Sequence, residues 1–223
     1  MVIGIGMLAN AFKNYLNDDN IIIFASGVSN SQEQNIKEYE REFDLLSLYS
    51  HSTKKLIYFS TCSIFDKSLE DSKYIKHKIR IETFIKENFK NYLIFRLPNV
   101  IGKTNNNNTS FNYFKNKIIN QEEIQIQVNA IRYFIDVDDL VNILPIIISS
   151  QTNQTINVCF NNKIYIKDLI SIFENILKIS AKKVFIDKGL NYSVDNLYFM
   201  NIVRKNNLKI NENYNFNLIK KYL

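Results

Sequence analysis

Three short apolar runs, separated by segments of helical periodicity, constrain the fold of this chain more than any other feature. The runs span residues 21–24, 56–59 and 92–95, and each is apolar without interruption. Such runs are typical of strands that are buried on both faces of a parallel sheet. Helical patterns occupy the stretches between them, at about 32–50 and 72–89. The alternation predicts an α/β fold whose parallel sheet is built from right-handed strand–helix–strand units.

The composition excludes several classes of protein. Of the 223 residues, 46% are apolar and 22% are charged, close to the average of folded globular domains. The 28 Lys and Arg residues outnumber the 22 Asp and Glu residues by six, but they are scattered, so we expect no nucleic-acid partner. Two cysteines and two histidines are too few for a disulfide scaffold or a zinc site, and we expect no metal. Without a bilayer-spanning stretch or a secretory signal, the sequence predicts a cytoplasmic protein with no membrane partner.

A glycine-containing turn follows the first predicted strand, at residues 2–5. From Gly4 to Ala9 the sequence has the spacing GxGxxA, and a helical pattern follows. Glycine at such a turn lets the backbone approach a pyrophosphate, and the helix N-terminus offers free N–H groups. A tight turn between strand and helix explains the same pattern without a ligand, so the turn alone leaves both interpretations open.

A hydroxyl, a phenol and an ammonium group follow the strand at 56–59. Thr61 lies at the strand end, and Tyr74 and Lys78 have YxxxK spacing on the next helix. Residues i and i+4 share a helix face, so the phenol and the ammonium point into the same space. An adjacent ammonium favours the phenolate and lowers the pKa of tyrosine from about 10, as acid–base catalysis near neutral pH requires. Taken alone, the pair also fits an exposed helix face.

The order of these segments resembles the extended short-chain dehydrogenases/reductases, in particular the nucleotide-sugar epimerases, dehydratases and reductases. Two later segments are similar to signatures of that family, namely Arg96-Leu97-Pro98-Asn99-Val100-Ile101-Gly102 and the RYFIDVDDL segment at 132–140. The resemblance covers most of residues 2–160. It implies a Rossmann-like nucleotide-binding domain at 1–150, with residues 103–130 contributing to a substrate lobe, and a small C-terminal substrate lobe at 151–223.

Carried over residue by residue, the resemblance implies catalytic and cofactor-binding positions. Thr61, Tyr74 and Lys78 match the catalytic triad, with Tyr74 as the acid–base and Lys78 as the residue that binds the nicotinamide ribose and tunes Tyr74. The implied cofactor is NAD or NADP. The positions that match cofactor-binding residues are Gly4, Gly6, Ala9, Ala25, Ser26, Gly27, Pro98 and Asn99. Asp139 is expected to cap the helix that follows it and to tie that helix to the lobe.

The sequence also departs from the family. Cys62 and Ser63 stand at two positions after Thr61 where the dehydratases carry Asp and Glu, which disfavours dehydration of the sugar. Only one helix and a turn fit between Gly6 and the strand at 21–24, where the family has two further strands. We therefore predict a sheet without its usual second and third strands, with most of the adenosine pocket missing and NAD and NADP undistinguished. His77 is expected at the surface or the edge of the core, and Cys62 as a buried apolar residue.

The resemblance implies an NAD(P)-dependent reductase of a nucleotide-linked 4-keto-6-deoxy sugar, acting in surface polysaccharide biosynthesis. A nucleotide-sugar epimerase of the same family is one alternative. A truncated, non-catalytic relative that binds a sugar nucleotide or a partner is another. The expected partners are the nucleotide sugar and a second copy of the chain, since the family pairs subunits through the helix that carries Tyr74 and the helix before it. Residues that could supply that homodimer interface are Phe43, Leu46, Ile81 and Ile85.

Overall fold

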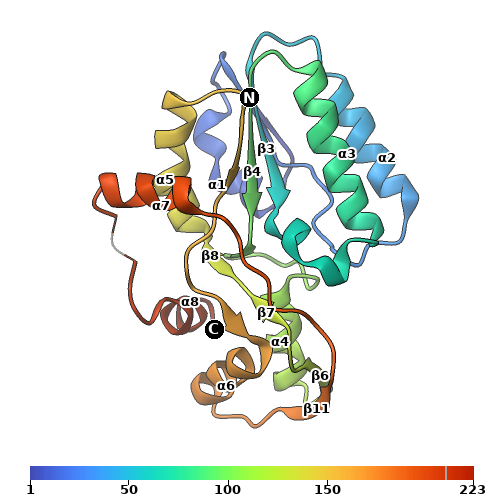
Figure 1. Cartoon of the computed structure of the whole chain (residues 1–223), viewed down its shortest axis with the longest axis vertical. Helices are drawn as coiled ribbons and strands as arrows, with labels where there is room; N and C mark the ends of the chain where they lie inside the picture. Colours follow the sequence, from blue (N-terminus) through green and yellow to red (C-terminus); the bar gives the residue numbers. More distant parts are fainter. Residues whose placement is uncertain (209) are drawn as a thin grey trace.

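A five-stranded parallel sheet forms the larger part of the computed structural model, which describes residues 1–208 and 210–223 (Figure 1). The strands lie in the order β1-β2-β3-β4-β9. Every neighbouring pair is parallel, so the carboxyl ends of all five strands meet at one edge. Their bounds are Val2–Ile3, Ile21–Phe24, Lys55–Thr61, Tyr92–Leu97 and Gln154–Asn157. The predicted α/β class with a parallel sheet is confirmed.

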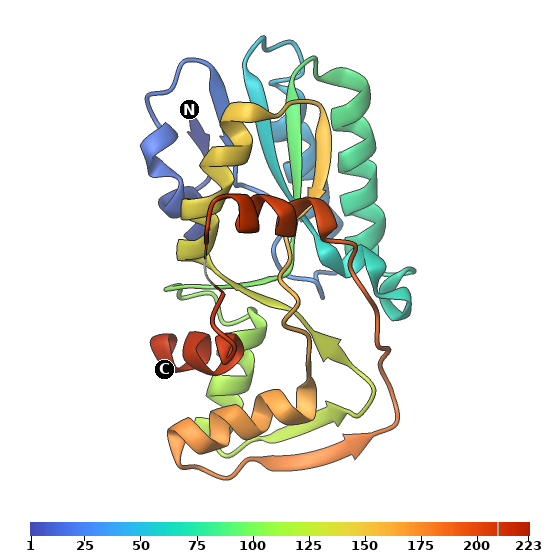
Figure 2. The same cartoon turned by 60° about the vertical axis from the view of Figure 1, so that its left-hand side comes forward.

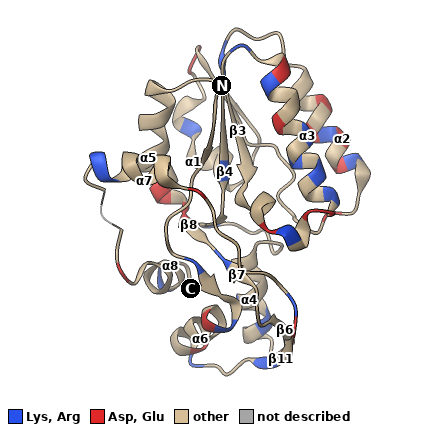
Figure 3. Ribbon diagram, viewed as in Figure 1, with Lys and Arg blue, Asp and Glu red and all other residues tan. Residues whose placement is uncertain are grey.

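The apolar runs form strands because both of their faces are covered by helices (Figure 2). Alternate residues of β3 enter two different cores: Leu56 and Tyr58 pack with α2 (Ile36–Ser47) and α3 (Lys73–Asn88), whereas Ile57 faces the other side. The opposite core is closed by α1 (Met7–Ala11), α5 (Val137–Ser150) and α7 (Leu197–Lys205). Basic and acidic residues are interleaved on the outer surface of α2 (Figure 3). Within the described residues, no helix has the length and apolar character needed to cross a membrane.

Strand β1 lies at the edge of the sheet. Only α1 and one 3₁₀ turn, Lys13–Tyr15, connect β1 to β2, and β2 pairs directly with β1. In the described residues no strand pairs with the outer side of β1. The prediction that two strands of the usual sheet are missing is therefore confirmed.

The smaller lobe has its own apolar core and three strand pairs. Strand β5 (Asn99–Ile101) pairs with β8 (Phe134–Asp136), β6 (Glu123–Gln127) with β11 (Lys182–Ile186), and β7 (Ile131–Arg132) with β10 (Ile164–Tyr165). The helices of the lobe are α4 (Ser110–Ile119), α6 (Ile166–Leu177) and α8 (Tyr214–Tyr222). A division of the chain after residue 150 stays a prediction, and two elements that follow it, β9 and α7, pack with the large sheet.

Helix α8 is anchored to the start of α5 by charged and phenolic groups. The Asp136 side chain caps α5 by accepting a hydrogen bond from the Asp138 N–H at 3.0 Å. Asp139 is not the cap, because it lies inside the first turn, where it accepts a hydrogen bond from the Tyr214 hydroxyl at 2.5 Å. Lys221 reaches Asp136 at 2.7 Å and Asp138 at 2.5 Å. The expected cap was therefore wrong by three residues, while Asp139 does tie α5 to the lobe.

Three residues expected at a homodimer interface lie in the core instead. Leu46, Ile81 and Ile85 are fully buried against β2, β3 and β4. The apolar stripes of α2 and α3 therefore face the sheet, and these residues are not free to contact a second copy of the chain.

Candidate active site

The predicted cofactor turn lies against the end of β2. Gly4 has a φ of +123°, and a Cβ at this position would lie 2.4 Å from the Ala25 carbonyl oxygen, so only glycine fits. Gly6 differs, because nothing lies within 4 Å of the place where its Cβ would be. Ala9 is buried one turn into α1. The turn thus brings Gly4 and Ala25 together and leaves the Gly6 backbone facing open space.

Thr61 and Tyr74 meet at the carboxyl end of β3. The short span between them folds into two 3₁₀ turns, Cys62–Phe65 and Lys67–Leu69, so the chain returns at once to the start of α3. Thr61 caps the first turn by accepting a hydrogen bond from the Ser63 N–H at 3.0 Å, and Ser72 caps α3. Tyr74, in the first turn of α3, is 8% exposed.

The pKa of the Tyr74 phenol is raised, contrary to what the YxxxK spacing predicts. Burial raises this pKa because it disfavours the phenolate. The Lys78 ammonium and the nearby Thr61 hydroxyl lower it, while the Glu42 carboxylate raises it again. The spacing correctly places the Lys78 ammonium near the Tyr74 phenol. Burial nevertheless raises the pKa of Tyr74 by more than this charge lowers it.

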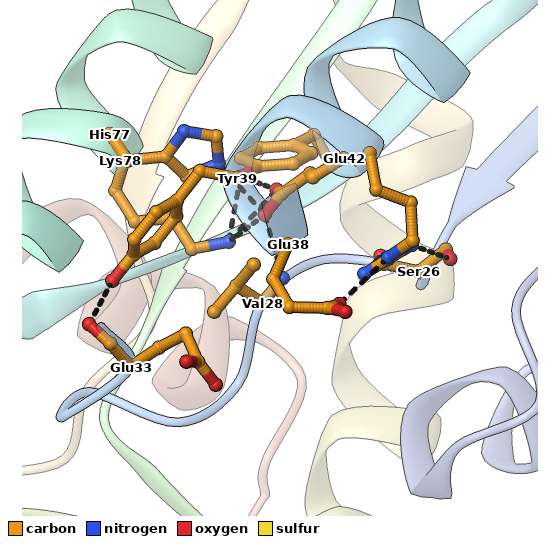
Figure 4. Close-up of polar contacts among 10 residues, drawn as sticks. Ser26, Val28, Glu33, Glu38, Tyr39, Glu42, His77 and Lys78 are labelled. Carbon is orange, nitrogen blue, oxygen red and sulfur yellow. Dashed lines mark hydrogen bonds and ion pairs between the residues drawn. The ribbon is translucent and has the colours of Figure 1, made fainter. Parts of the chain in front are cut away.

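Lys78 lies in a buried polar cluster (Figure 4). Its Nζ lies 3.0 Å and 3.3 Å from the two carboxylate oxygens of Glu42, on α2, and 2.9 Å from the Tyr58 hydroxyl. A Cβ at Gly27 would lie 2.9 Å from the same Nζ. Gly27, a predicted cofactor-binding residue, is therefore also required by the packing of the Lys78–Glu42 ion pair.

The comparison with protein families decides the assignment. A model of the NAD dependent epimerase/dehydratase family matches residues 7–159, well over half of the chain. The chain belongs to this family. No curated protein sequence matches it significantly.

Solved structures of other proteins share the fold of this family member. A UDP-N-acetylglucosamine 4-epimerase from Methanobrevibacter ruminantium, in complex with UDP-N-acetylmuramic acid, is 18% identical with a TM-score of 0.70, over 94% of this chain and 77% of the epimerase chain. RMD from Pseudomonas aeruginosa, complexed with NADPH, is 14% identical with a TM-score of 0.70, over 99% and 97% of the two chains. A dTDP-4-dehydrorhamnose reductase from Clostridium acetobutylicum is 15% identical with a TM-score of 0.69, over 95% and 83%. At these identities the likeness establishes the fold alone.

The residues present fit one half of a nicotinamide dinucleotide better than the other. The glycine turn is open at Gly6, and Thr61 and Tyr74 converge one strand beyond Ala25. At the other end of such a ligand, the edge of the sheet stops at β1, where this family member lacks two strands. Among the described residues, the groups that fit such a ligand therefore lie at the glycine turn and at the end of β3, and no strand lies beyond β1.

Of the remaining predicted cofactor residues, Ser26 and Asn99 form hydrogen bonds with other residues of the protein. The Ser26 carbonyl and hydroxyl oxygens accept hydrogen bonds from the Arg41 guanidinium at 3.2 Å. Asn99 donates to the Tyr133 carbonyl oxygen at 3.1 Å and accepts from the Ser110 hydroxyl at 2.8 Å. The half-buried Pro98 joins β4 to β5. These contacts fix the loops at the strand ends.

Glu82, four residues after Lys78 on α3, and Cys62 have structural roles. Glu82 accepts hydrogen bonds from the Ser60 hydroxyl at 2.6 Å and from Arg96 at 2.9 and 2.6 Å, which joins α3 to β3 and β4. Cys62 is buried as expected, and its thiol donates a hydrogen bond to the Arg96 carbonyl oxygen at 3.1 Å. The neighbouring Cys159 thiol and burial raise the pKa of Cys62 well above its usual value. A thiol held in the neutral form is a poor nucleophile.

Two members of the polar cluster were not recognised in the sequence. Glu42 was not singled out, and His77, expected at the surface or core edge, is buried with its Nε2 3.0 Å from a Glu42 oxygen. The missed signal is the position of Glu42 in α2, where it shares the buried face with Tyr39 and Leu46. An acidic residue between apolar residues at helical spacing indicates a buried partner cation.

Proposed function

We propose that the protein is an NAD(P)-dependent reductase of a nucleotide-linked keto sugar. Family membership supports a nucleotide-sugar enzyme of the epimerase, dehydratase and reductase group. The observation that carries the reductase assignment is the position of the Tyr74 phenol in the first turn of α3, close to Thr61 at the end of β3 and with the Lys78 ammonium 5.8 Å from its ring centre. A protonated phenol is a proton donor, which is what reduction of a ketone requires.

In this proposal Thr61, Tyr74 and Lys78 each have a separate role in the reduction. When bound, the nicotinamide ring supplies the hydride that reduces the keto carbon. Thr61 donates a hydrogen bond to the keto oxygen and orients it toward Tyr74. Tyr74 transfers its proton to that oxygen as the negative charge develops there. The Lys78 ammonium, 5.8 Å from the centre of the Tyr74 ring, stabilises the resulting phenolate.

The substrate class follows from the RLPNVIGK segment at 96–103, which resembles the branch that reduces 4-keto-6-deoxy sugars. We accordingly propose a nucleotide-linked 4-keto-6-deoxy sugar of surface polysaccharide biosynthesis as the substrate. A guanidinium at the end of β7, that of Arg132, is partly exposed and lies 4.0 Å from Asp66 near the strand ends. A cation at this place is suited to the diphosphate of such a substrate.

A homodimer remains part of the proposal, through Phe43, which is only partly buried, and through residues that were not first expected. Ile36 and Leu48 at the two ends of α2 and Ile79 on α3 are exposed apolar residues. On the same two helices, the Arg80 guanidinium lies 4.1 Å from the centre of the Phe43 ring. A mixed apolar and charged surface of this kind is suited to pairing with a second copy of the chain.

A non-catalytic binding function is the second candidate, favoured by the missing strands at β1.

The test of the reductase function is the rate of NADH or NADPH oxidation with a nucleotide-linked 4-keto-6-deoxy sugar. Tyr74→Phe is expected to lower kcat by about 10²–10⁴-fold, because the proton donor is lost. The control Tyr113→Phe removes an exposed phenol on α4 and should leave kcat unchanged.

Undiminished turnover by a folded Tyr74→Phe variant would contradict the assignment of Tyr74. If the wild-type protein binds a sugar nucleotide but neither dinucleotide, the non-catalytic function replaces the reductase.

A further inference from the structure

A single buried carboxylate, that of Glu42, lies at the centre of the cluster around Lys78 (Figure 4). It accepts hydrogen bonds from the Val28 N–H at 2.6 Å, the Tyr58 hydroxyl at 2.5 Å, His77 Nε2 at 3.0 Å and Lys78 Nζ at 3.0 Å. Burial alone would raise the pKa of Glu42, but the Lys78 ammonium and the donated hydrogen bonds hold it well below its usual range. Glu42 therefore carries a full negative charge inside the protein.

This carboxylate fixes the position of the Lys78 ammonium. An ammonium has three donors, and those of Lys78 are directed to the Glu42 carboxylate and the Tyr58 hydroxyl. The Lys78 side chain is 3% exposed, and Gly27 closes another side of the ammonium. The place of the cation is thus set by protein groups before any ligand binds.

Tyr74 faces both charges of the ion pair. Lys78, one turn along α3, favours the phenolate, and Glu42, on α2, opposes it. The other ionisable groups that face Tyr74 are Tyr39 on α2 and Tyr58 on β3, and burial raises the pKa of each, so both are neutral near pH 7. The Lys78–Glu42 pair therefore supplies the two charges that act on Tyr74, and His77, whose Nε2 lies 3.0 Å from a Glu42 oxygen, is the further ionisable group of the cluster.

We propose that Glu42 is a positioning residue: its carboxylate holds the Lys78 ammonium and offsets part of that charge at Tyr74, so that the phenol stays protonated until it donates to the substrate. This inference rests on the proposed reductase function. A reductase delivers a proton to a keto oxygen, whereas an enzyme that first oxidises a sugar hydroxyl must remove one. Glu42 thereby helps to keep Tyr74 in the protonated form that the reduction step uses.

Titration of Tyr74 tests this role without depending on activity. The protein is labelled with ¹³C at tyrosine Cζ, the Tyr74 signal is assigned with Tyr74→Phe, and its shift is followed with pH. Glu42→Gln is expected to lower the midpoint by about one pH unit or more, because the Lys78 charge is no longer offset. The matched control is Glu40→Gln, an equal charge change at an exposed position of α2, which should leave the midpoint unchanged. An unchanged midpoint in folded Glu42→Gln overturns the proposal.

A second variant covers the case in which Glu42→Gln does not fold. Glu42→Asp keeps a carboxylate as the partner of the buried Lys78 ammonium, but its side chain is shorter by one methylene group, so the carboxylate lies farther from the ammonium. Its Tyr74 midpoint is expected to fall by a smaller amount, on the order of 0.5 pH unit. A midpoint equal to or above that of the wild-type protein overturns the proposal.

The pH profile of the reduction distinguishes positioning from a merely structural role. In Glu42→Gln the alkaline limb of kcat should move down in pH together with the Tyr74 midpoint, with the KM for the keto sugar unchanged. An equal loss of kcat at every pH would indicate a structural role and overturn the proposal. A wild-type protein without reductase activity contradicts the proposed function, while the Tyr74 titration still decides the role of Glu42.

Discussion

The ends of β2 to β4 and the edge at β1 differ in what they offer a dinucleotide. At β2 to β4, Thr61, Tyr74 and Lys78 converge, and the ion pair behind them is buried. At β1 the sheet stops, and the nearby Ile5 is 96% exposed. In the proposed function the first region holds the groups that act on the reacting atoms, whereas the second would hold groups that only anchor the adenosine. Under that proposal, catalysis and cofactor anchoring occupy separate parts of the fold, and the anchoring part is the one that is reduced here.

The largest expected difference between the two regions is in stability. Lys78→Met removes the ammonium that pairs with the buried Glu42 carboxylate and leaves His77 as its remaining ionisable neighbour, which should lower the free energy of unfolding by about 3–5 kcal/mol. Ile5→Ser, at the exposed edge, should change the free energy of unfolding by less than about 0.5 kcal/mol. Urea denaturation of the two variants measures both values. If both variants lost the same free energy of unfolding, the two regions would not differ in their contribution to stability.

Two glycine substitutions sharpen the comparison. In Gly27→Ala the new Cβ meets Lys78 Nζ at 2.9 Å and a Glu42 oxygen at 3.0 Å, and we expect a loss of about 1–3 kcal/mol in the free energy of unfolding. In Gly6→Ala the Cβ meets no atom within 4 Å, and the expected change is below about 0.5 kcal/mol. Thermal and urea unfolding compare the two. A Gly6→Ala variant as unstable as Gly27→Ala would show that the turn is packed rather than open.

The smallest expected effect concerns the adenosine itself. Calorimetric titration should give Kd values for NADH and for reduced nicotinamide mononucleotide within about tenfold of each other, or about 1.4 kcal/mol. The reason is that the edge at β1 provides few contacts for the adenosine. NADPH serves as a third ligand in the same titration. If either dinucleotide binds more than about 100-fold tighter than the mononucleotide, another part of the molecule holds the adenosine.

The sheet was predictable from the sequence because its signals are local. Uninterrupted apolar runs such as 21–24 indicate strands buried on both faces, and the short connection after Gly6 indicates the missing strands. Which side of a helix meets the sheet is harder to predict. Leu46 on α2 and Ile81 on α3 each lie on an apolar stripe that fits a sheet or a second subunit equally well, and the structure places both against the sheet.

The site was predictable only in part. Thr61, Tyr74 and Lys78 follow from strand ends and helix spacing, but the pKa of Tyr74 depends on burial and on Glu42, which lies 32 residues before Tyr74 in a run of charged residues. Side chains in such a run are expected in solvent. The packing of α2 against α3 and β3 shows that Glu42 points inward, which the sequence indicates only through its helical spacing with Tyr39 and Leu46.

The anchoring of α8 has a consequence for how the chain is made. The Lys221 ammonium and the Tyr222 hydroxyl bind the Asp136 carboxylate across 85 and 86 residues of sequence. Synthesis proceeds from the N-terminus, so β1 to β4 leave the ribosome well before α8 exists. Until then the first turn of α5 lacks the groups that join it to the smaller lobe. In the nascent chain, β1 to β4 would thus be available to pair before α8 is made, and the contacts that join α5 to α8 would form only afterwards.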